Sequence, residues 1–170
     1  LYSHFEGIDT LFARFYVKFH KETGYTHHLV NFMADRNPTP WPKGGAGRAP
    51  RGDQGFSSAI EPCGLGGTTD PPGIWCFYSY WHEMRGGWGN VFYDSFEQIE
   101  AGRWYCVEVM IKANTSPEKA EGEQALWIDG GEAAILRYRD LALEFPAEMG
   151  PGRLSAMGKD MLGADRIADA

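Results

Sequence analysis

The sequence predicts an all-β protein, an antiparallel β-sandwich, and three observations lead to this fold class. Several segments alternate apolar and polar residues with a period of two, which is the pattern of a half-buried strand. The 170 residues include 22 Gly and 10 Pro beside 6 Trp, 8 Tyr and 10 Phe. This composition is typical of short strands joined by many turns. No amphipathic helical pattern occurs before residue 140, so we expect sheets rather than helices to enclose the core.

The strands follow one another at short intervals along the chain. In residues 11–19, one face carries Ala13, Phe15, Val17 and Phe19, and the other carries Arg14, Tyr16 and Lys18. In residues 104–113 the alternation is the clearest of all, with Tyr105, Val107, Val109, Ile111 and Ala113 on one face and Cys106, Glu108, Met110, Lys112 and Asn114 on the other. The other predicted strands are 27–33, 56–61, 74–84, 124–129 and 133–138. Such a set is expected to form two packed antiparallel sheets.

The chain is predicted to hold one domain. We place the sandwich at residues 1–140 and an irregular or helical tail at 141–170, where Ala, Gly, Met and Asp dominate and alternation fades. A sandwich normally ends with a strand that returns beside the first, and none is evident here, so we predict that a terminal strand is lacking or distorted. A long Pro- and Gly-rich loop spans 37–55, and loops of this length in compact domains commonly carry function.

The charge balance disfavours nucleic acids as partners. Sixteen Lys and Arg against 23 Asp and Glu give a net charge of −7, which disfavours general binding to a nucleic acid backbone. No run of about 18 apolar residues exists, so we expect no membrane-spanning helix. The chain opens at Leu1 without a signal peptide, as though an upstream segment had been removed.

A hairpin pattern near the middle of the chain carries a resemblance to a known superfamily. The pattern begins with Gly102-Arg103-Trp104 and ends with Trp127-Ile128-Asp129-Gly130. The first motif opens a strand with a Trp that covers the edge of the core, and Asp-Gly supplies the positive φ angles of a tight turn. The segment resembles the concanavalin A-like lectin/glucanase and laminin-G-like superfamily, which implies a jelly-roll sandwich. The likeness is close over 102–130 and looser over 11–139.

The resemblance implies proteins that bind or cleave polysaccharides. Members with a Glu-x-Asp-x-x-Glu strand are retaining glycoside hydrolases, and this motif is absent here. The lyases of the superfamily need a cation or amide that neutralises a uronate carboxylate, a His or Tyr base and a Tyr acid. Lys112-Ala113 is similar to the Lys-Ala of the alginate-lyase strand, so the resemblance is nearest in character to the jelly-roll polysaccharide lyases.

Seven residues are the candidates for β-elimination on an acidic glycan. His27 or His28 would be the base, Tyr78 or Tyr80 the proton donor, and Arg14, Lys112 or Arg48 the carboxylate neutraliser. Because His27 and His28 are neighbours on a predicted strand, we expect only one of them, His27, to face a groove. The alternative for each residue is an ordinary solvent-facing or structural position.

A further set is predicted to bind the substrate. These side chains are polar or aromatic and share the outward faces of the predicted strands or the basic and aromatic loops: Tyr16, Lys18, Asn31, Trp41, Arg48, Arg51, His82, Arg85, Trp88, Glu108 and Asn114. Charge-assisted hydrogen bonds and aromatic stacking are the means by which such residues hold an acidic sugar. For the loop residues, a solvated flexible loop is the competing interpretation.

The cysteines and acidic residues leave cofactor questions open. Cys63, Cys76 and Cys106 do not fit a zinc spacing. Cys76 and Cys106 both belong to outward sets, so a cross-strand disulfide is one alternative and reduced thiols are the other. We expect no cofactor; a structural calcium ion held by Asp70, Asp129 and Asp140 is the alternative.

We therefore predict a secreted or periplasmic polysaccharide lyase of an acidic glycan. The alternatives are a non-catalytic carbohydrate-binding module and a laminin-G-like domain that binds a protein. The lyase prediction requires Arg14, His27, Tyr80 and Lys112 to converge on one concave face, because shared chemistry needs shared geometry.

Overall fold

The computed structural model describes residues 2–4, 8–35, 46–50, 55–93, 97–115, 119–131, 136–141 and 154–158. In 2–4, 136–141 and 154–158, and at residue 35, the backbone alone is described. Within these ranges no helix is long and apolar enough to cross a membrane.

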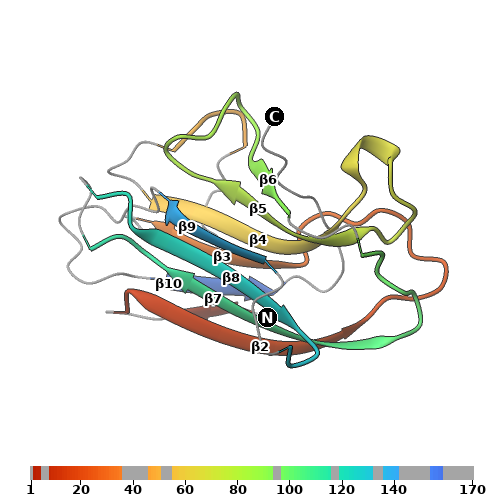
Figure 1. Ribbon diagram of the computed structural model, residues 1–170. Helices are drawn as coiled ribbons and strands as arrows, with labels where there is room; N and C mark the ends of the chain where they lie inside the picture. Colours follow the sequence, from red (N-terminus) through yellow and green to blue (C-terminus); the bar gives the residue numbers. More distant parts are fainter. Residues whose placement is uncertain are drawn as a thin grey trace.

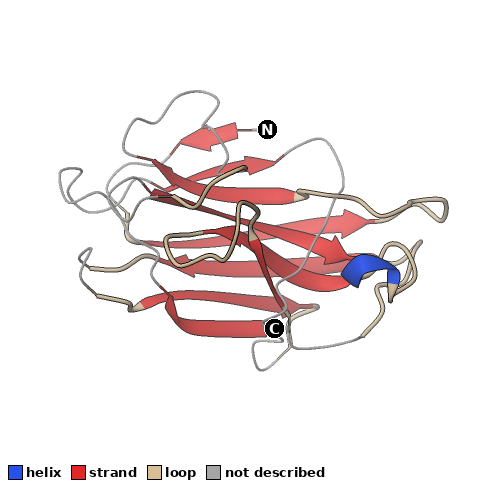
Figure 2. Ribbon diagram, turned by 90° about the horizontal axis from the view of Figure 1, so that it is seen from above, coloured by secondary structure: helices blue, strands red, loops and turns tan. Residues whose placement is uncertain are grey.

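Two antiparallel sheets stack face to face, which confirms the predicted sandwich (Figure 1). Sheet A has six strands in the spatial order β1 (Tyr2–His4), β10 (Leu154–Gly158), β3 (Val30–Asp35), β4 (Gly55–Cys63), β5 (Ile74–Tyr80) and β6 (Asn90–Phe92). Sheet B has four strands in the order β2 (Thr10–Lys18), β7 (Trp104–Lys112), β8 (Gly122–Ile128) and β9 (Leu136–Leu141). Seen from above, strands dominate and the short 3₁₀ helix Leu65–Gly67 lies at one end (Figure 2).

The apolar core fills the space between the sheets. Sheet A contributes residues such as Phe32, Ile60 and Phe77, and sheet B contributes Val107 and Leu126, all of them fully buried. Side chains alternate along each strand, so the neighbours of these residues point out of the sandwich on one side or the other. The core thereby fixes which residues of each sheet can reach a substrate.

One polar network crosses this core. Ser58 of β4 and Ser79 of β5 lie 2.8 Å apart through their hydroxyls, and both donate to Gln124 Oε1 of β8, at 2.8 and 3.3 Å. All three residues are fully buried. Because a buried polar group is costly without a partner, these bonds link the two sheets in a specific alignment.

The predicted hairpin motif forms as expected. Strand β7 pairs with β8 over Val107–Lys112 and Glu123–Ile128, and a turn follows at Asp129 and Gly130, with φ of 55° and 70°. The Asp129 amide donates to the carbonyl of Cys106 at 2.8 Å. Positive φ at both central positions is what the Asp-Gly pair supplies.

The C-terminal segment differs from the prediction. Residues 154–158 form β10, which pairs with both β1 and β3 inside sheet A. This part of the predicted irregular or helical tail therefore belongs to the sandwich and supplies the strand that the sequence did not reveal. The segment LSAMG is short and does not alternate apolar and polar residues, so periodicity did not reveal this strand. Residues 159–170 lie outside the described residues.

Candidate functional site

The outer face of sheet A carries a row of polar and aromatic side chains. Asn31 is in register with Ala59, and Ala59 with Tyr78, so the three lie side by side across β3, β4 and β5. Neighbouring strands are about 4.8 Å apart, so the backbones of Asn31 and Tyr78 are about 10 Å apart with the small Ala59 between them. All three are buried, at 6%, 1% and 7% exposure, so this row is covered by other parts of the chain.

His27 and His28 lie together at the start of β3. His28 adopts a left-handed backbone with φ of 65°, and β3 begins only at Val30. The two rings stack with centroids 3.7 Å apart, and the centroid of Tyr78 lies 5.1 Å from His27 and 5.5 Å from His28. The prediction that only one histidine faces the groove is thus wrong, because the left-handed residue breaks the alternation of a strand.

A buried carboxylate lies beneath the two histidines. Glu61 of β4 is fully buried, whereas the His27 and His28 side chains are 47% and 26% exposed. Nδ1 of His27 is 3.2 Å from Glu61 Oε1, and Nδ1 of His28 is 3.0 Å from Oε2. The backbone N–H of His28 also donates to Oε2. Glu61 is thus a residue of the site that the sequence did not reveal.

Tyr78 and Tyr80 complete the cluster on β5. Their hydroxyls lie 3.1 Å apart, and the backbone N–H of Gly89 donates to the Tyr78 hydroxyl at 3.0 Å. Both side chains are buried, at 7% and 5% exposure. A pair of hydrogen-bonded phenols next to two imidazoles can pass a proton to or from a bound molecule.

Two loops border this face. The Gly47 N–H donates to the Gly87 carbonyl at 2.7 Å, and Ala49 and Met84 pack on Tyr78 and Tyr80. These loops carry four of the predicted binding residues, all exposed: Arg48, His82, Arg85 and Trp88. The structure therefore places a cationic and aromatic border beside the cluster of His27, His28, Glu61, Tyr78 and Tyr80, here called the His–Tyr cluster.

The remaining strand-borne candidates lie on the opposite side of the molecule. Arg14, Tyr16 and Lys18 of β2 alternate with core residues and point out of sheet B. Arg14 Nη2 is 2.6 Å from Glu108 Oε1 of β7, and this ion pair raises the pKa of Arg14 above its usual range. The predicted convergence of Arg14 and Lys112 with His27 and Tyr80 is wrong, because the core separates the two outer faces.

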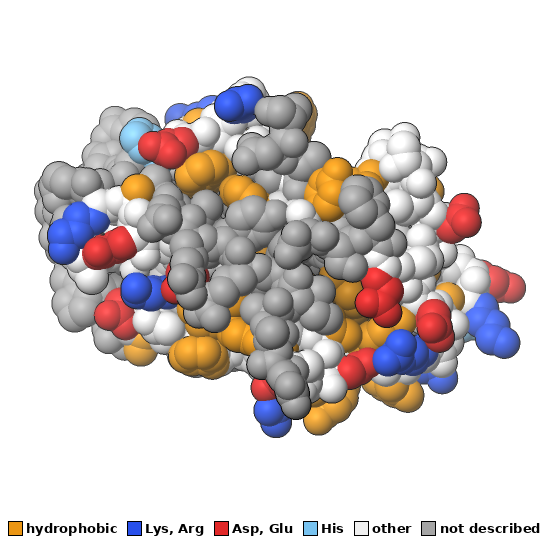
Figure 3. Space-filling view, in the orientation of Figure 1, with side chains coloured by type: hydrophobic (Ala, Val, Ile, Leu, Met, Phe, Trp, Pro, Cys, Tyr) orange, Lys and Arg blue, Asp and Glu red, His pale blue; other side chains and the backbone are white. Residues whose placement is uncertain are grey.

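Glu108 and Lys112 of β7 also point out of sheet B, and Asn114 follows just after this strand. Lys112 is in register with Thr10 and Glu123 on the outside of sheet B, and Asn114 is buried at 4% exposure just beyond β7. Lys112 and Glu108 therefore point away from sheet A. The outer face of sheet B instead presents three exposed apolar side chains: Phe12, Tyr16 and Trp104. Figure 3 shows hydrophobic side chains interspersed with charged ones on the molecular surface. A hollow of about 500 Å³ there is bordered by Phe12, Arg14, Glu108 and Trp127.

Of the two alternatives for Cys76 and Cys106, the cross-strand disulfide is wrong. Cys76 lies in sheet A and Cys106 in sheet B, so the Cys76–Cys106 disulfide is excluded by the core between them. The Sγ atoms of Cys63 and Cys76 are 3.0 Å apart on neighbouring strands, and both residues are buried thiols.

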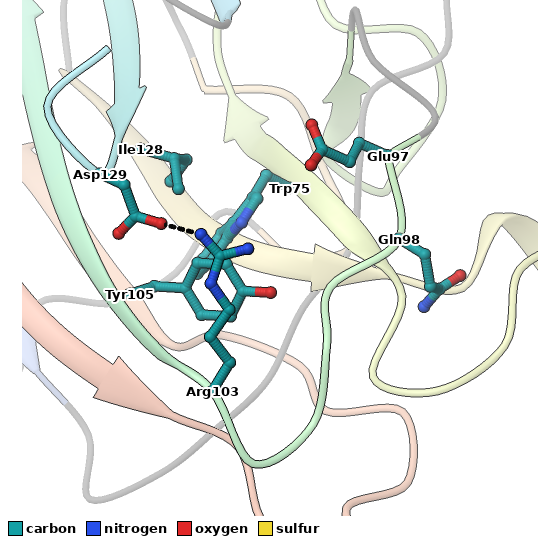
Figure 4. A pocket seen from close by; sticks show the side chains of 7 residues that line it. All are labelled: Trp75, Glu97, Gln98, Arg103, Tyr105, Ile128 and Asp129. Carbon is teal, nitrogen blue, oxygen red and sulfur yellow. Dashed lines mark hydrogen bonds and ion pairs between the residues drawn. The ribbon is translucent and has the colours of Figure 1, made fainter.

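A second hollow lies at the end of the sandwich, with a volume of about 170 Å³ (Figure 4). Arg103 pairs with Asp129 and lies 4.7 Å from the centroid of the Tyr105 ring, and these neighbours raise the pKa of Arg103 against the effect of burial. Asp129 Oδ1 accepts the Cys106 N–H at 2.9 Å and Oδ2 accepts Arg103 at 2.5 Å. Both carboxylate oxygens of Asp129, one of the predicted calcium ligands, therefore already have protein partners.

Three predicted residues have side chains that the structure does not describe. Trp41 and Arg51 lie outside the described residues, and of Asp140 only the backbone is described.

Comparison with solved structures places this sandwich in a known structural class. The chain is similar to a variant of alginate lyase Aly36B in complex with alginate tetrasaccharide, with a TM-score of 0.63 and 17% identity over 98% of this chain and 68% of that one. It is similar to another Aly36B variant with alginate trisaccharide, with a TM-score of 0.59 and 19% identity over 92% and 62%. Alginate lyase vAL-1 from Chlorella virus matches with a TM-score of 0.53 and 15% identity over 93% and 66%.

These likenesses confirm the jelly-roll β-sandwich of the kind found in polysaccharide lyases. The chain spans 62–68% of the length of these three structures. No family model matches the sequence. No curated protein matches it either.

Proposed function

We propose that the protein is a polysaccharide lyase that cleaves an acidic glycan by β-elimination on the outer face of sheet A. The observation that supports it most is the His–Tyr cluster, in which both imidazoles and the Tyr80 ring have their centroids within 5.5 Å of the Tyr78 centroid. The fold adds support, because the structures it resembles are alginate lyases. Their chains are longer and share few residues with this one, so the glycan is proposed only as a uronate polymer.

The proposed roles follow from the hydrogen bonds. His28 Nδ1 lies 3.0 Å from Glu61 Oε2; with the proton on Nδ1, the imidazole keeps a free lone pair at Nε2. Nε2 then takes the proton next to the uronate carboxyl group, and the electron pair of that C–H bond forms the new C=C bond. The glycosidic C–O bond breaks, and Tyr78 donates its hydroxyl proton to the departing oxygen, with Tyr80 as its hydrogen-bond partner.

The uronate carboxylate needs a positive or hydrogen-bonding partner when charge develops beside it. Arg48, on the loop that packs over Tyr78 and Tyr80, is proposed for this role in place of Arg14 and Lys112. Asn31, in the same row as Tyr78, is proposed to donate an amide hydrogen bond. His82, Arg85 and Trp88 would contact neighbouring sugars from the second loop. A protein that acts on such polymers is expected to be secreted or periplasmic.

Substrate screening tests the proposal. The protein is incubated with alginate, glucuronan and pectate, and the unsaturated uronate product is followed by its ultraviolet absorbance. We expect product from one of these polymers, and a loss of about 100-fold or more in rate for His28→Gln. The matched control is His20→Gln, an exposed histidine in the turn after β2.

Two results would contradict the proposal. Retardation by an affinity gel of the same polymers without any product would favour a carbohydrate-binding module. Neither product nor retardation would favour a domain that binds a protein partner.

A further inference from the structure

The three donor atoms of His27, His28 and Glu61 have the arrangement of a metal site. One ring nitrogen of each histidine and one carboxylate oxygen of Glu61 all lie within 4.8 Å of one another. The carboxylate is fully buried and the imidazoles are partly exposed. Two imidazole nitrogens and one carboxylate oxygen form a ligand set that suits Zn²⁺ and related divalent transition metals.

The distances between donors agree with coordination. Zinc–ligand bonds of about 2.0–2.2 Å separated by 90–110° place adjacent donors roughly 3.0–3.4 Å apart. The two Nδ1–carboxylate distances are 3.2 and 3.0 Å. Each histidine–carboxylate pair is therefore spaced as two ligands of one cation are.

The burial of the Glu61 carboxylate also favours a bound cation. Glu61 is fully buried, and among the described residues its charged or chargeable partners are His27 and His28 alone. Its Oε1 atom accepts no hydrogen bond from the part of the chain that the structure describes. A buried carboxylate is costly unless a cation or several donors compensate it.

We propose that this cluster is a site for a divalent transition metal such as Zn²⁺, and that metal binding there inhibits the lyase. Coordination uses the Nδ1 lone pair and leaves the imidazole proton on Nε2. Proton abstraction needs the opposite tautomer, with the proton on Nδ1 and the lone pair on Nε2. The metal-bound and catalytic states of His28 therefore exclude each other. Only the inhibitory role depends on the proposed lyase activity; the binding does not.

The proposed metal would lie beside the groups proposed for catalysis. Three protein ligands leave a coordination position for water or for a carboxylate of the glycan. Tyr78 lies next to both histidine rings, so a metal held here would lie close to the proposed proton donor as well as to the base.

Metal binding is tested first, without any substrate. The full chain is treated with a chelator, dialysed and titrated with Zn²⁺ by isothermal titration calorimetry. We expect one ion per chain, and Glu61→Gln is expected to weaken it by about 100-fold or more, because even losing an outer-shell partner costs 10–100-fold. Glu22→Gln is the control, since Glu22 is an exposed residue of the turn after β2. The proposal is overturned if no ion binds to the wild type, or if Glu61→Gln binds as tightly as Glu22→Gln.

If Glu61→Gln proves unfolded by circular dichroism, His27→Gln replaces it, because this half-exposed side chain is a milder change. His27→Gln is then compared with His20→Gln, and equal affinity for Zn²⁺ in the two variants overturns the site.

The inhibitory role is tested in parallel by product formation with chelated and Zn²⁺-loaded protein. We expect the chelated protein to be active, the loaded protein to lose about 10-fold or more of that rate, and chelator to restore it. A loaded protein that is equally or more active overturns the inhibition while leaving the site in place. Stoichiometric binding with no product from either form leaves the site in place and contradicts the lyase proposal itself.

Discussion

Replacing Tyr78 by Phe separates the structural and chemical roles of one hydroxyl. That hydroxyl accepts the Gly89 N–H at 3.0 Å and lies 3.1 Å from the Tyr80 hydroxyl. Tyr78 is 7% exposed, so water has little access to the groups left behind. Leaving one buried donor unpaired costs about 1–3 kcal/mol, and we expect about 2 kcal/mol of lost unfolding free energy. For a chain of this size that corresponds to a fall of about 4–8 °C in melting temperature.

The assay pairs unfolding with catalysis. Urea unfolding followed by tryptophan fluorescence gives the free energy, and product formation gives the rate, which we expect to fall by about 100-fold or more if the hydroxyl is the acid. Tyr16→Phe is the matched control, because Tyr16 is 66% exposed on sheet B. It should change stability by less than about 0.5 kcal/mol and leave the rate unaltered. A Tyr78→Phe variant as stable and as active as this control would refute the reasoning.

Three further predictions address the scaffold. Ser58→Ala removes a donor to the buried Gln124 Oε1 and should lower the unfolding free energy by about 1–2 kcal/mol. Urea unfolding measures this loss, and an unchanged free energy would mean that the network does not link the sheets. Gly73→Ala should cost about 3 kcal/mol or more, because its φ is 113° and an added Cβ would lie 2.2 Å from the Cys63 carbonyl oxygen. The control Gly130→Ala, with φ of 70° and open space around it, should cost only about 1 kcal/mol, and equal losses would contradict this contact. The hydroxyl and the backbone amide of Thr115 donate to the Glu121 carboxylate, which lowers the pKa of Glu121. These bonds stabilise the folded state above the ordinary carboxyl pKa, and their contribution is lost as the pH falls through the lowered pKa. Carboxyl NMR titration should show Thr115→Val moving the pKa of Glu121 upward, and an unchanged pKa would contradict the assignment.

Alternation along the strands made the sandwich predictable, together with the sets of residues that share a face. Tyr78 and Tyr80 are two residues apart, so alternation puts them on one face of β5, and the turn at Asp129 and Gly130 followed from the need for positive φ. Alternation does not tell which sheet a strand joins, because sheet membership depends on contacts between distant segments. Arg14 and Tyr80 both belong to outward sets, and the structure places them on opposite sides of the core.

Other features of the site depend on local exceptions to the strand pattern. The left-handed backbone of His28 brings two adjacent rings to the same side. Loops cover the outer face of sheet A, so every residue of β4 is buried and Glu61 is a buried carboxylate on the outside of a sheet. Neither exception has a signal in composition or periodicity.

The most direct measurement compares the two outer faces of the sandwich in one lyase assay. One variant, Arg14→Ala/Lys112→Ala, alters sheet B, and the other, His28→Gln/Arg48→Ala, alters the His–Tyr cluster and its bordering loop. We predict that the first keeps the wild-type rate of unsaturated product release on the uronate polymer that the protein cleaves, and that the second abolishes it. The reverse result would place the chemistry on sheet B and contradict the account.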